Sequence, residues 1–170
     1  MVCTISASAI QLVPTSVDHV IYVADHLREI DREELRVFGV TSMRACLMGS
    51  YLVSEPCWTL LCEDRAAAVG GVAQCPEEPE TGSPWFLATD LIDLPEVRLA
   101  LAYRSQRVVQ QIQEKFAKLE NWILANNGRT LAWLQWLGFE VSEAKEVPFA
   151  SAPVRHITRH KEATCALPSL

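Results

Sequence analysis

The side chains of this sequence that could carry out chemistry are scattered along the chain. The six cysteines are Cys3, Cys46, Cys57, Cys62, Cys75 and Cys165. None of them belongs to a C-x-x-C pair, and no histidine cluster lies nearby at the spacing of a zinc site. We therefore expect reduced and mostly buried thiols in a cytoplasm-like compartment, with no metal site and no disulfide.

Four further side chains carry groups that could donate or accept a proton: Tyr103, Cys75, Glu55 and His26. Each of them also fits a purely structural role. Tyr103 is typical of an aromatic residue on a helix and Cys75 of a core residue, whereas Glu55 and His26 are expected in solvent. The sequence places none of the four beside a reacting bond, so we expect the structural roles.

Two carboxylates, Asp90 and Asp93, stand in residues 89–95, between an apolar strand and a long helix. A helix N-terminus binds phosphate when glycines let the backbone N–H groups approach the anion. This stretch contains no glycine, lysine or arginine, and Pro95 has no N–H group. We therefore expect it to disfavour an anionic ligand, with Arg98 or Arg104 as the nearest cations that could compensate.

The composition is that of one ordinary globular domain. The chain has 170 residues, of which 49% are hydrophobic and 21% charged, so it can bury a core and is not of the disordered class. Its net charge of −6 argues against general nucleic-acid binding, which needs clustered cations. No Lys or Arg precedes Arg28, and no apolar run approaches the ~20 residues of a membrane span. We therefore expect a soluble protein with neither a signal peptide nor a transmembrane segment.

Hydrophobic periodicity predicts an α+β fold, a mainly antiparallel sheet of about six or seven strands with helices on both faces. One helix after Thr15 or Ser16 should carry a buried stripe through Val20, Val23, Leu27 and Ile30. In the first half of the chain we also expect a strand at 10–12, helical structure up to Gly39, and a further helix capped by Thr41. A hairpin (57–62 and 66–73) should follow, with a bulge or close approach at Gly70 and Gly71, and then a solvated loop at 76–83. In the second half we expect a strand at 84–89, a long helix after Asp93 and Pro95, a strand at 119–125, a helix ending at Gly138, and strands at 139–141 and 154–158. Residues 1–158 should form one domain and residues 159–170 a tail.

This order of elements resembles the GNAT acyltransferase fold. Residues 127–139 are similar to that family's strand-to-helix segment, which opens on Asn and closes on Leu-Gly-Phe. More narrowly, several segments resemble the GNAT-like internal virion and virion-assembly proteins of short-tailed phages. They are residues 27–31 with Glu33 and Glu34, the strand with Gly70 and Gly71, strand 84–89, and residues 120–122 leading to Asn127, Trp133 and Leu134. The resemblance covers roughly residues 8–145.

The resemblance implies tests of activity. Active members bind acetyl-CoA with a Gly-rich loop between the central strand and the long helix, where this chain has residues 89–95. They commonly use a Tyr four residues before the Gly as general acid, a position held here by Leu134, which cannot transfer a proton. If CoA binds, the resemblance assigns its contacts to Leu87, Ala88, Thr89 and Asn127. Asn127 is equally placed to cap the following helix, and we favour capping.

Candidate partner residues lie on the last two predicted helices. Trp133 and Trp136 are three positions apart and form one stripe of a helix, and Leu134 and Leu137 form a neighbouring stripe. The two stripes cannot easily face the same sheet. One tryptophan is thus a candidate for a partner surface. The long helix has a basic flank, in which Arg104 and Arg107 could meet an acidic partner, and an acidic loop (77–80) could complement it.

We therefore expect a phage virion or virion-assembly protein, internal or tail-associated, built on a GNAT-like fold with a degraded acetyl-CoA site. It would act without a cofactor, in the virion or host cytoplasm, by contacts with other phage structural proteins or with another copy of itself. The alternative is an active N-acetyltransferase that moves acetyl from acetyl-CoA to an amine. A host-directed inhibitor or regulator of the same fold is a third possibility.

Overall fold

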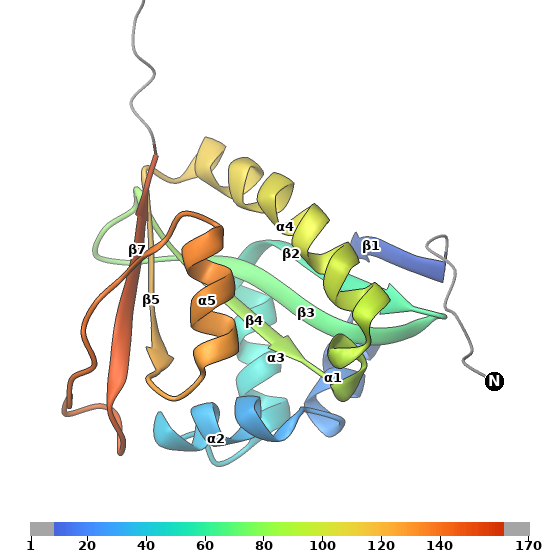
Figure 1. Cartoon of the computed structure of the whole chain (residues 1–170), viewed down its shortest axis with the longest axis horizontal. Helices are drawn as coiled ribbons and strands as arrows, with labels where there is room; N and C mark the ends of the chain where they lie inside the picture. The colour runs from blue at the N-terminus through green and yellow to red at the C-terminus, as the bar shows by residue number, and fades with distance from the viewer. Residues whose placement is uncertain (1–8, 162–170) are drawn as a thin grey trace, which may run out of the picture.

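A computed structural model describes residues 9–161, which form a seven-stranded sheet covered by helices on both faces (Figure 1). The strands are β1 (Ile10–Pro14), β2 (Ser54–Cys62), β3 (Arg65–Gln74), β4 (Thr81–Ala88), β5 (Lys118–Leu124), β6 (Glu140–Val141) and β7 (Val154–His160). The helices are α1 (Val17–Asp25), α2 (Glu29–Val37), α3 (Met43–Val53), α4 (Pro95–Lys115) and α5 (Gly128–Trp136), with a 3-10 helix, η2 (Asp90–Asp93). The strand order is β1-β2-β3-β4-β5-β7-β6, and only β4 and β5 pair in parallel. The predicted α+β architecture is thus confirmed.

The first predicted helix is in fact two helices. Ser16 caps α1, accepting a hydrogen bond from the backbone N–H of His19, but α1 ends at Asp25. The chain is then extended at Arg28, and Leu27 forms a bridge with Thr89 at the end of β4 before α2 begins. The predicted stripe from Val20 to Ile30 therefore breaks because Leu27 is held by the sheet. Ser42, and not Thr41, caps α3.

The glycine pair of β3 lies where other chain segments approach closely. A Cβ at Gly71 would come within 2.6 Å of the Cys57 Sγ, so the close approach predicted for this pair is present. The solvated loop predicted at 76–83 ends earlier than expected, because Thr81 and Gly82 are buried in β4. Gly82 packs so closely that a Cβ there would lie 2.9 Å from the Phe116 ring.

The two helical layers pack on opposite faces of the sheet. Helices α4 and α5 cover one face, with Ile112, Phe116 and Leu134 in their core, and α1 and α3 cover the other, with Val20 and Leu47 in theirs (Figure 1). Strand β7 runs to His160, past the point where a tail was expected. The division into a domain and a tail remains a prediction, because residues 162–170 lie outside the described part of the chain. In residues 9–161, no helix has the length and apolar character that crossing a membrane requires.

Candidate functional site

The central strands β4 and β5 separate soon after they pair. Their ladder contains two residue pairs, Thr81 with Lys118 and Gly82 with Leu119. The Asn121 side-chain amide donates to the Pro84 carbonyl at 2.7 Å, and beyond that point the two strands point in different directions (Figure 1). Diverging strands expose backbone groups, because each loses its neighbour.

The open edge of β4 presents the backbone of Phe86. The Pro84 carbonyl bonds Asn121, and the Ala88 N–H bonds the Asp31 carboxylate, so both residues face the side from which β5 has separated. Backbone groups alternate in direction along a strand, and Phe86 lies midway between these two. Its N–H and C=O therefore point into the opening.

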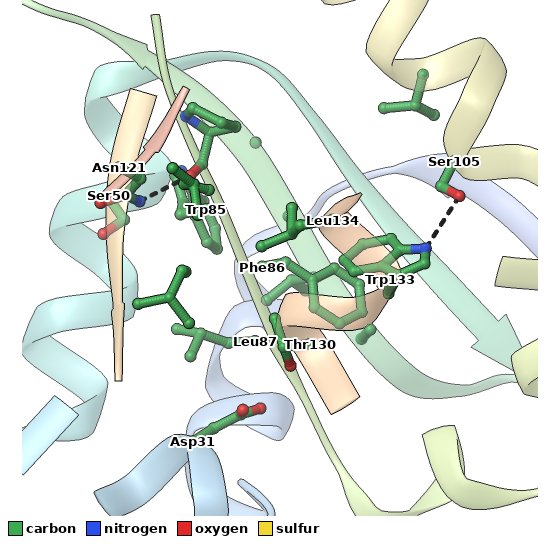
Figure 2. Close-up of a pocket in the computed structure, with 18 of the residues that line it drawn as sticks. Asp31, Ser50, Trp85, Phe86, Leu87, Ser105, Asn121, Thr130, Trp133 and Leu134 are labelled. Atoms are coloured by element: carbon green, nitrogen blue, oxygen red, sulfur yellow. Dashed lines mark hydrogen bonds between the residues drawn. The ribbon is translucent and has the colours of Figure 1, made fainter. Parts of the chain in front are cut away.

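A cavity of about 440 Å³ occupies this opening (Figure 2). Its lining includes Trp85 and Leu87, which pack on the side of α1 and α3, and Phe86 and Leu134, which pack on the side of α4 and α5. The cavity therefore reaches both faces of the sheet at the place where β4 and β5 separate.

Aromatic rings build the wall on the side of α4 and α5. The Trp133 and Phe86 rings lie 5.2 Å apart between centroids, in a tilted arrangement. The Trp133 indole N–H donates to the hydroxyl of Ser105 on α4 at 3.3 Å, which fixes the ring (Figure 2). Trp133 is thus half-buried against the core, and of the two tryptophans Trp136 remains the candidate for a partner surface. Leu134 is also buried, and no proton-transferring group stands at its position.

Helix α2 contributes two carboxylates that sequence reasoning did not assign to the site. One Asp31 oxygen accepts from the Ala88 N–H of β4 and from the Arg28 guanidinium, each at 2.8 Å. One Glu34 oxygen accepts from the Leu124 N–H of β5 at 3.0 Å and from the Asn127 side chain at 3.2 Å. Residues three apart share a helix face, so this spacing was the available signal. One turn of α2 therefore binds the ends of both diverging strands.

Burial raises the pKa of both carboxyl groups. For Asp31 the hydrogen bond and charge of Arg28 oppose this effect, and for Glu34 the bonds from Asn127 and Leu124 do so. Asp31 forms an ion pair with Arg28. Glu34 has no cation within ion-pair distance among the residues that the structure describes. Its carboxyl group lines the cavity, and the positive charge that acts on it, that of Arg28, is itself paired with Asp31.

The segment expected to disfavour anions is neutralised in part by a residue that the sequence did not single out. Asp93, at the end of η2, forms an ion pair with Arg129 in the first turn of α5. Arg104, expected to compensate, instead donates to the Ile10 carbonyl at 2.8 Å. The segment has no glycine, but Arg129 of α5 offsets the negative charge of Asp93, so the expectation that the segment disfavours anions stays a prediction.

The residues proposed for cofactor contact are only partly brought together. Leu87 and Asn127 both line the cavity. The Ala88 N–H donates to the Asp31 carboxylate. The buried Thr89 hydroxyl donates to the backbone carbonyls of Ala66 and Ala67 on β3. Asn127 makes no side-chain cap to α5, so the predicted cap is wrong, because its amide donates to Glu34 instead.

Most of the other candidates lie away from the cavity, although Arg104 is among the residues that line it. Trp136 and Arg107 are exposed, as a partner surface requires, and Arg104 is half-buried. Tyr103 is 86% exposed and His26 stacks on Tyr22, so neither lines the cavity. Cys75 and Glu55 do not line it either. The four cysteines within residues 9–161 are free, Cys3 and Cys165 fall outside the described residues, and no metal-ligand cluster occurs in the described part.

Comparisons with known proteins give the class of the fold. No family model and no curated protein matches the sequence. Among solved structures, a ribosomal L7/L12 α-N-protein acetyltransferase in complex with coenzyme A is similar, with a TM-score of 0.61, 12% identity and coverage of 92% of this chain and 96% of that one. An aminoglycoside acetyltransferase, also in complex with coenzyme A, has a TM-score of 0.62, 12% identity and coverage of 89% and 95%. A GNAT-family acetyltransferase from Streptococcus pneumoniae has a TM-score of 0.59, 9% identity and coverage of 89% and 98%.

The chain therefore has the GNAT acetyltransferase fold, as its order of elements predicted. At these identities the likeness concerns the fold, and the function must be argued from the site.

Proposed function

We propose that the protein is an N-acyltransferase, which takes an acyl group from an acyl-CoA thioester and transfers it to an amine. The observation that carries this proposal is the cavity at the separation of β4 and β5. Direct transfer needs both substrates in contact with each other, and a cavity that reaches both faces of a sheet gives each substrate its own entrance. This reverses the order of the two functions considered from the sequence.

The donor fits the side of α4 and α5. The pantetheine arm of CoA is a narrow, extended chain with two amide groups, so it can pair with an open strand edge as a further strand does. The backbone of Phe86 offers that edge, and the Phe86 and Trp133 rings give the arm an apolar wall. Arg129 supplies a cation at the start of α5 for the phosphates.

The acceptor then enters from the side of α2 and α3, where Glu34 lines the cavity. In the reaction the amine nitrogen attacks the thioester carbonyl, the C–N bond forms, and the C–S bond breaks to release the CoA thiolate. An ammonium must first lose a proton, and we assign Glu34 as the carboxylate that accepts it. Burial raises the pKa of Glu34, which makes it a stronger base for this step. The nitrogen loses a second proton to water as the amide forms, and because Leu134 carries no acid, the thiolate takes a proton from water.

Titration calorimetry with acetyl-CoA tests the proposal. We expect a one-to-one complex with a micromolar dissociation constant, and competition by CoA itself. Absence of heat and of competition at millimolar acetyl-CoA would remove the acyltransferase. The matched control is acetyl-pantetheine, which has the arm but not the nucleotide, and should bind more weakly.

A virion or virion-assembly role is the second candidate. Residues 89–95 support the part of this hypothesis that concerns a degraded acetyl-CoA site, because they have no glycine and keep Asp90 exposed where a phosphate cradle would need free N–H groups. On this hypothesis the fold serves as a scaffold for contacts with other phage structural proteins, and acetyl-CoA does not bind. Mass spectrometry of purified particles should then find the chain at a fixed copy number.

A further inference from the structure

The mouth of the cavity on the side of α2 is aromatic. Phe38, Trp122 and Phe149 line it, and we call these three residues the aromatic rim. The Phe149 ring lies 5.4 Å from that of Trp122, edge to face, and 6.5 Å from that of Phe38. Phe149 belongs to the segment between β6 and β7, which is fixed to the end of α2 because the Ser151 N–H donates to the Val37 carbonyl at 2.9 Å. The rim is therefore held in place by backbone contacts.

An alkylammonium group already lies on this rim. The Lys145 Nζ stands 4.9 Å from the centroid of the Trp122 ring, within the ~6 Å range of a cation–π contact. Lys145 is exposed, and its charge forms no ion pair within residues 9–161. The His156 ring also packs on Trp122, at 4.6 Å, and is itself held by Glu120. The Trp122 ring is thus held in place by His156 and carries the Lys145 ammonium as its cation.

The same cavity contains a carboxylate that forms no ion pair within residues 9–161. Asp31 is paired with Arg28, whereas Glu34 receives its hydrogen bonds only from the neutral groups of Leu124 and Asn127. A half-buried anion is costly unless a cation pairs with it. A ligand with a positive charge would supply that cation. The lining of the cavity also includes Trp85 and Leu35, whose apolar surfaces suit the methylene groups of a ligand.

We propose that the aromatic rim and the Glu34 carboxylate together bind the acceptor as a primary alkylammonium on a flexible aliphatic chain, of the lysine side-chain type. Lys145 occupies the rim when no acceptor is present. The inference rests on the proposed function for the statement that this ligand is an acceptor. The binding itself is independent of acetyl-CoA and can be measured without it.

The test is an NMR titration that follows the indole N–H signals of the five tryptophans. The probe is Nα-acetyl-lysine methylamide, and its neutral control is the norleucine analogue, which has the same chain without the ammonium. We expect a saturable shift of the Trp122 signal with the lysine probe and none with the norleucine probe. Lys145→Met, which removes the internal competitor, should tighten binding about 2–5-fold. Glu34→Gln should weaken it at least about 5-fold, and the exposed neighbour Glu33→Gln is the matched control.

Equal behaviour of the two probes in the wild type and in Lys145→Met would overturn the inference. Equal effects of Glu34→Gln and Glu33→Gln would also overturn it. Should Glu34→Gln fail to fold, Trp122→Leu replaces it, and undiminished lysine binding there overturns the proposal. Acetyl-CoA binding without lysine binding removes this inference and leaves the acyltransferase. Lysine binding without acetyl-CoA binding removes the acyltransferase and leaves the ammonium site.

Discussion

The Glu34 carboxylate on α2 accepts a hydrogen bond from the backbone N–H of Leu124, 90 residues further along the chain, at 3.0 Å. Asp31, one turn earlier on the same helix, does the same for Ala88 at the end of β4. A sheet that opens between two strands leaves N–H groups without partners, and such groups are costly when buried. The two carboxylates of α2 meet that need, so the helix and the opening of the sheet depend on each other.

Removal of Asp31 should be among the most destabilising single changes. In Asp31→Ala the Ala88 N–H and the Arg28 guanidinium, whose side chain is 11% exposed, both lose their partner. We expect a loss of about 3–5 kcal/mol in the free energy of unfolding, measured by urea denaturation. Glu29→Ala removes the exposed ion pair with Arg36 and should cost less than about 1 kcal/mol. Similar losses in the two variants would contradict this account of α2.

The stability of the fold should depend on pH through Glu34. Its folded pKa is raised above its ordinary value, so the folded state binds the proton more tightly than the unfolded chain does. This contribution is therefore fully present below the unfolded pKa of about 4.5 and is lost as pH rises through the higher folded pKa. The nearby charges are Asp31, which raises the pKa, and Arg28, which lowers it.

Denaturation curves of the wild type and Glu34→Gln, measured from pH 4 to pH 8, check this sign. Glutamine can still accept from Leu124 and Asn127 but does not titrate. The wild type should lose stability relative to the variant as pH rises, and the difference should be constant above the folded pKa. A difference that grows in favour of the wild type would show that the carboxylate is stabilised in the fold.

Arg129 should contribute to donor binding through the phosphates alone. Arg129→Ala is expected to weaken acetyl-CoA binding about 5–10-fold and to leave acetyl-pantetheine binding unchanged. Asp93→Asn, which releases Arg129 from its ion pair, should strengthen acetyl-CoA binding. Calorimetry on both variants measures this, with the exposed Arg107→Ala on α4 as the matched control. Equal losses in Arg129→Ala and Arg107→Ala would mean that only net charge matters.

Two glycines should respond in opposite ways to alanine. A Cβ at Gly82 would lie 2.8 Å from a Val72 methyl group and 2.9 Å from the Phe116 ring, so Gly82→Ala should cost about 1–3 kcal/mol. Gly49 lies inside α3 with open space around it, so Gly49→Ala should gain about 0.5–1 kcal/mol. Thermal unfolding of the two variants measures both effects. A stable Gly82→Ala would mean that β4 and α4 pack less tightly than described.

The sequence by itself determined the elements and their order. The apolar run of β4, the stripe of α4 and the stop at Gly138, whose φ is +83°, are local patterns, and each is present in the structure. Periodicity reports which face of a segment is buried, and this suffices for strands, helices and the fold class. It failed at Leu27, where a contact with Thr89 in the sheet divides one predicted helix into two.

Only the tertiary structure decided the site. The sequence pattern assigned no site role to Asp31 and Glu34 and favoured Asn127 as a cap, because their partners are 57, 90 and 93 residues away. Trp133 was one of two candidates for a surface residue, because its contact with Phe86 depends on how α5 packs on β4 and is not visible in the sequence pattern. A local pattern carries no information on which backbone N–H groups are left free when two strands separate. That divergence of β4 and β5 set both the cavity and the residues that surround it.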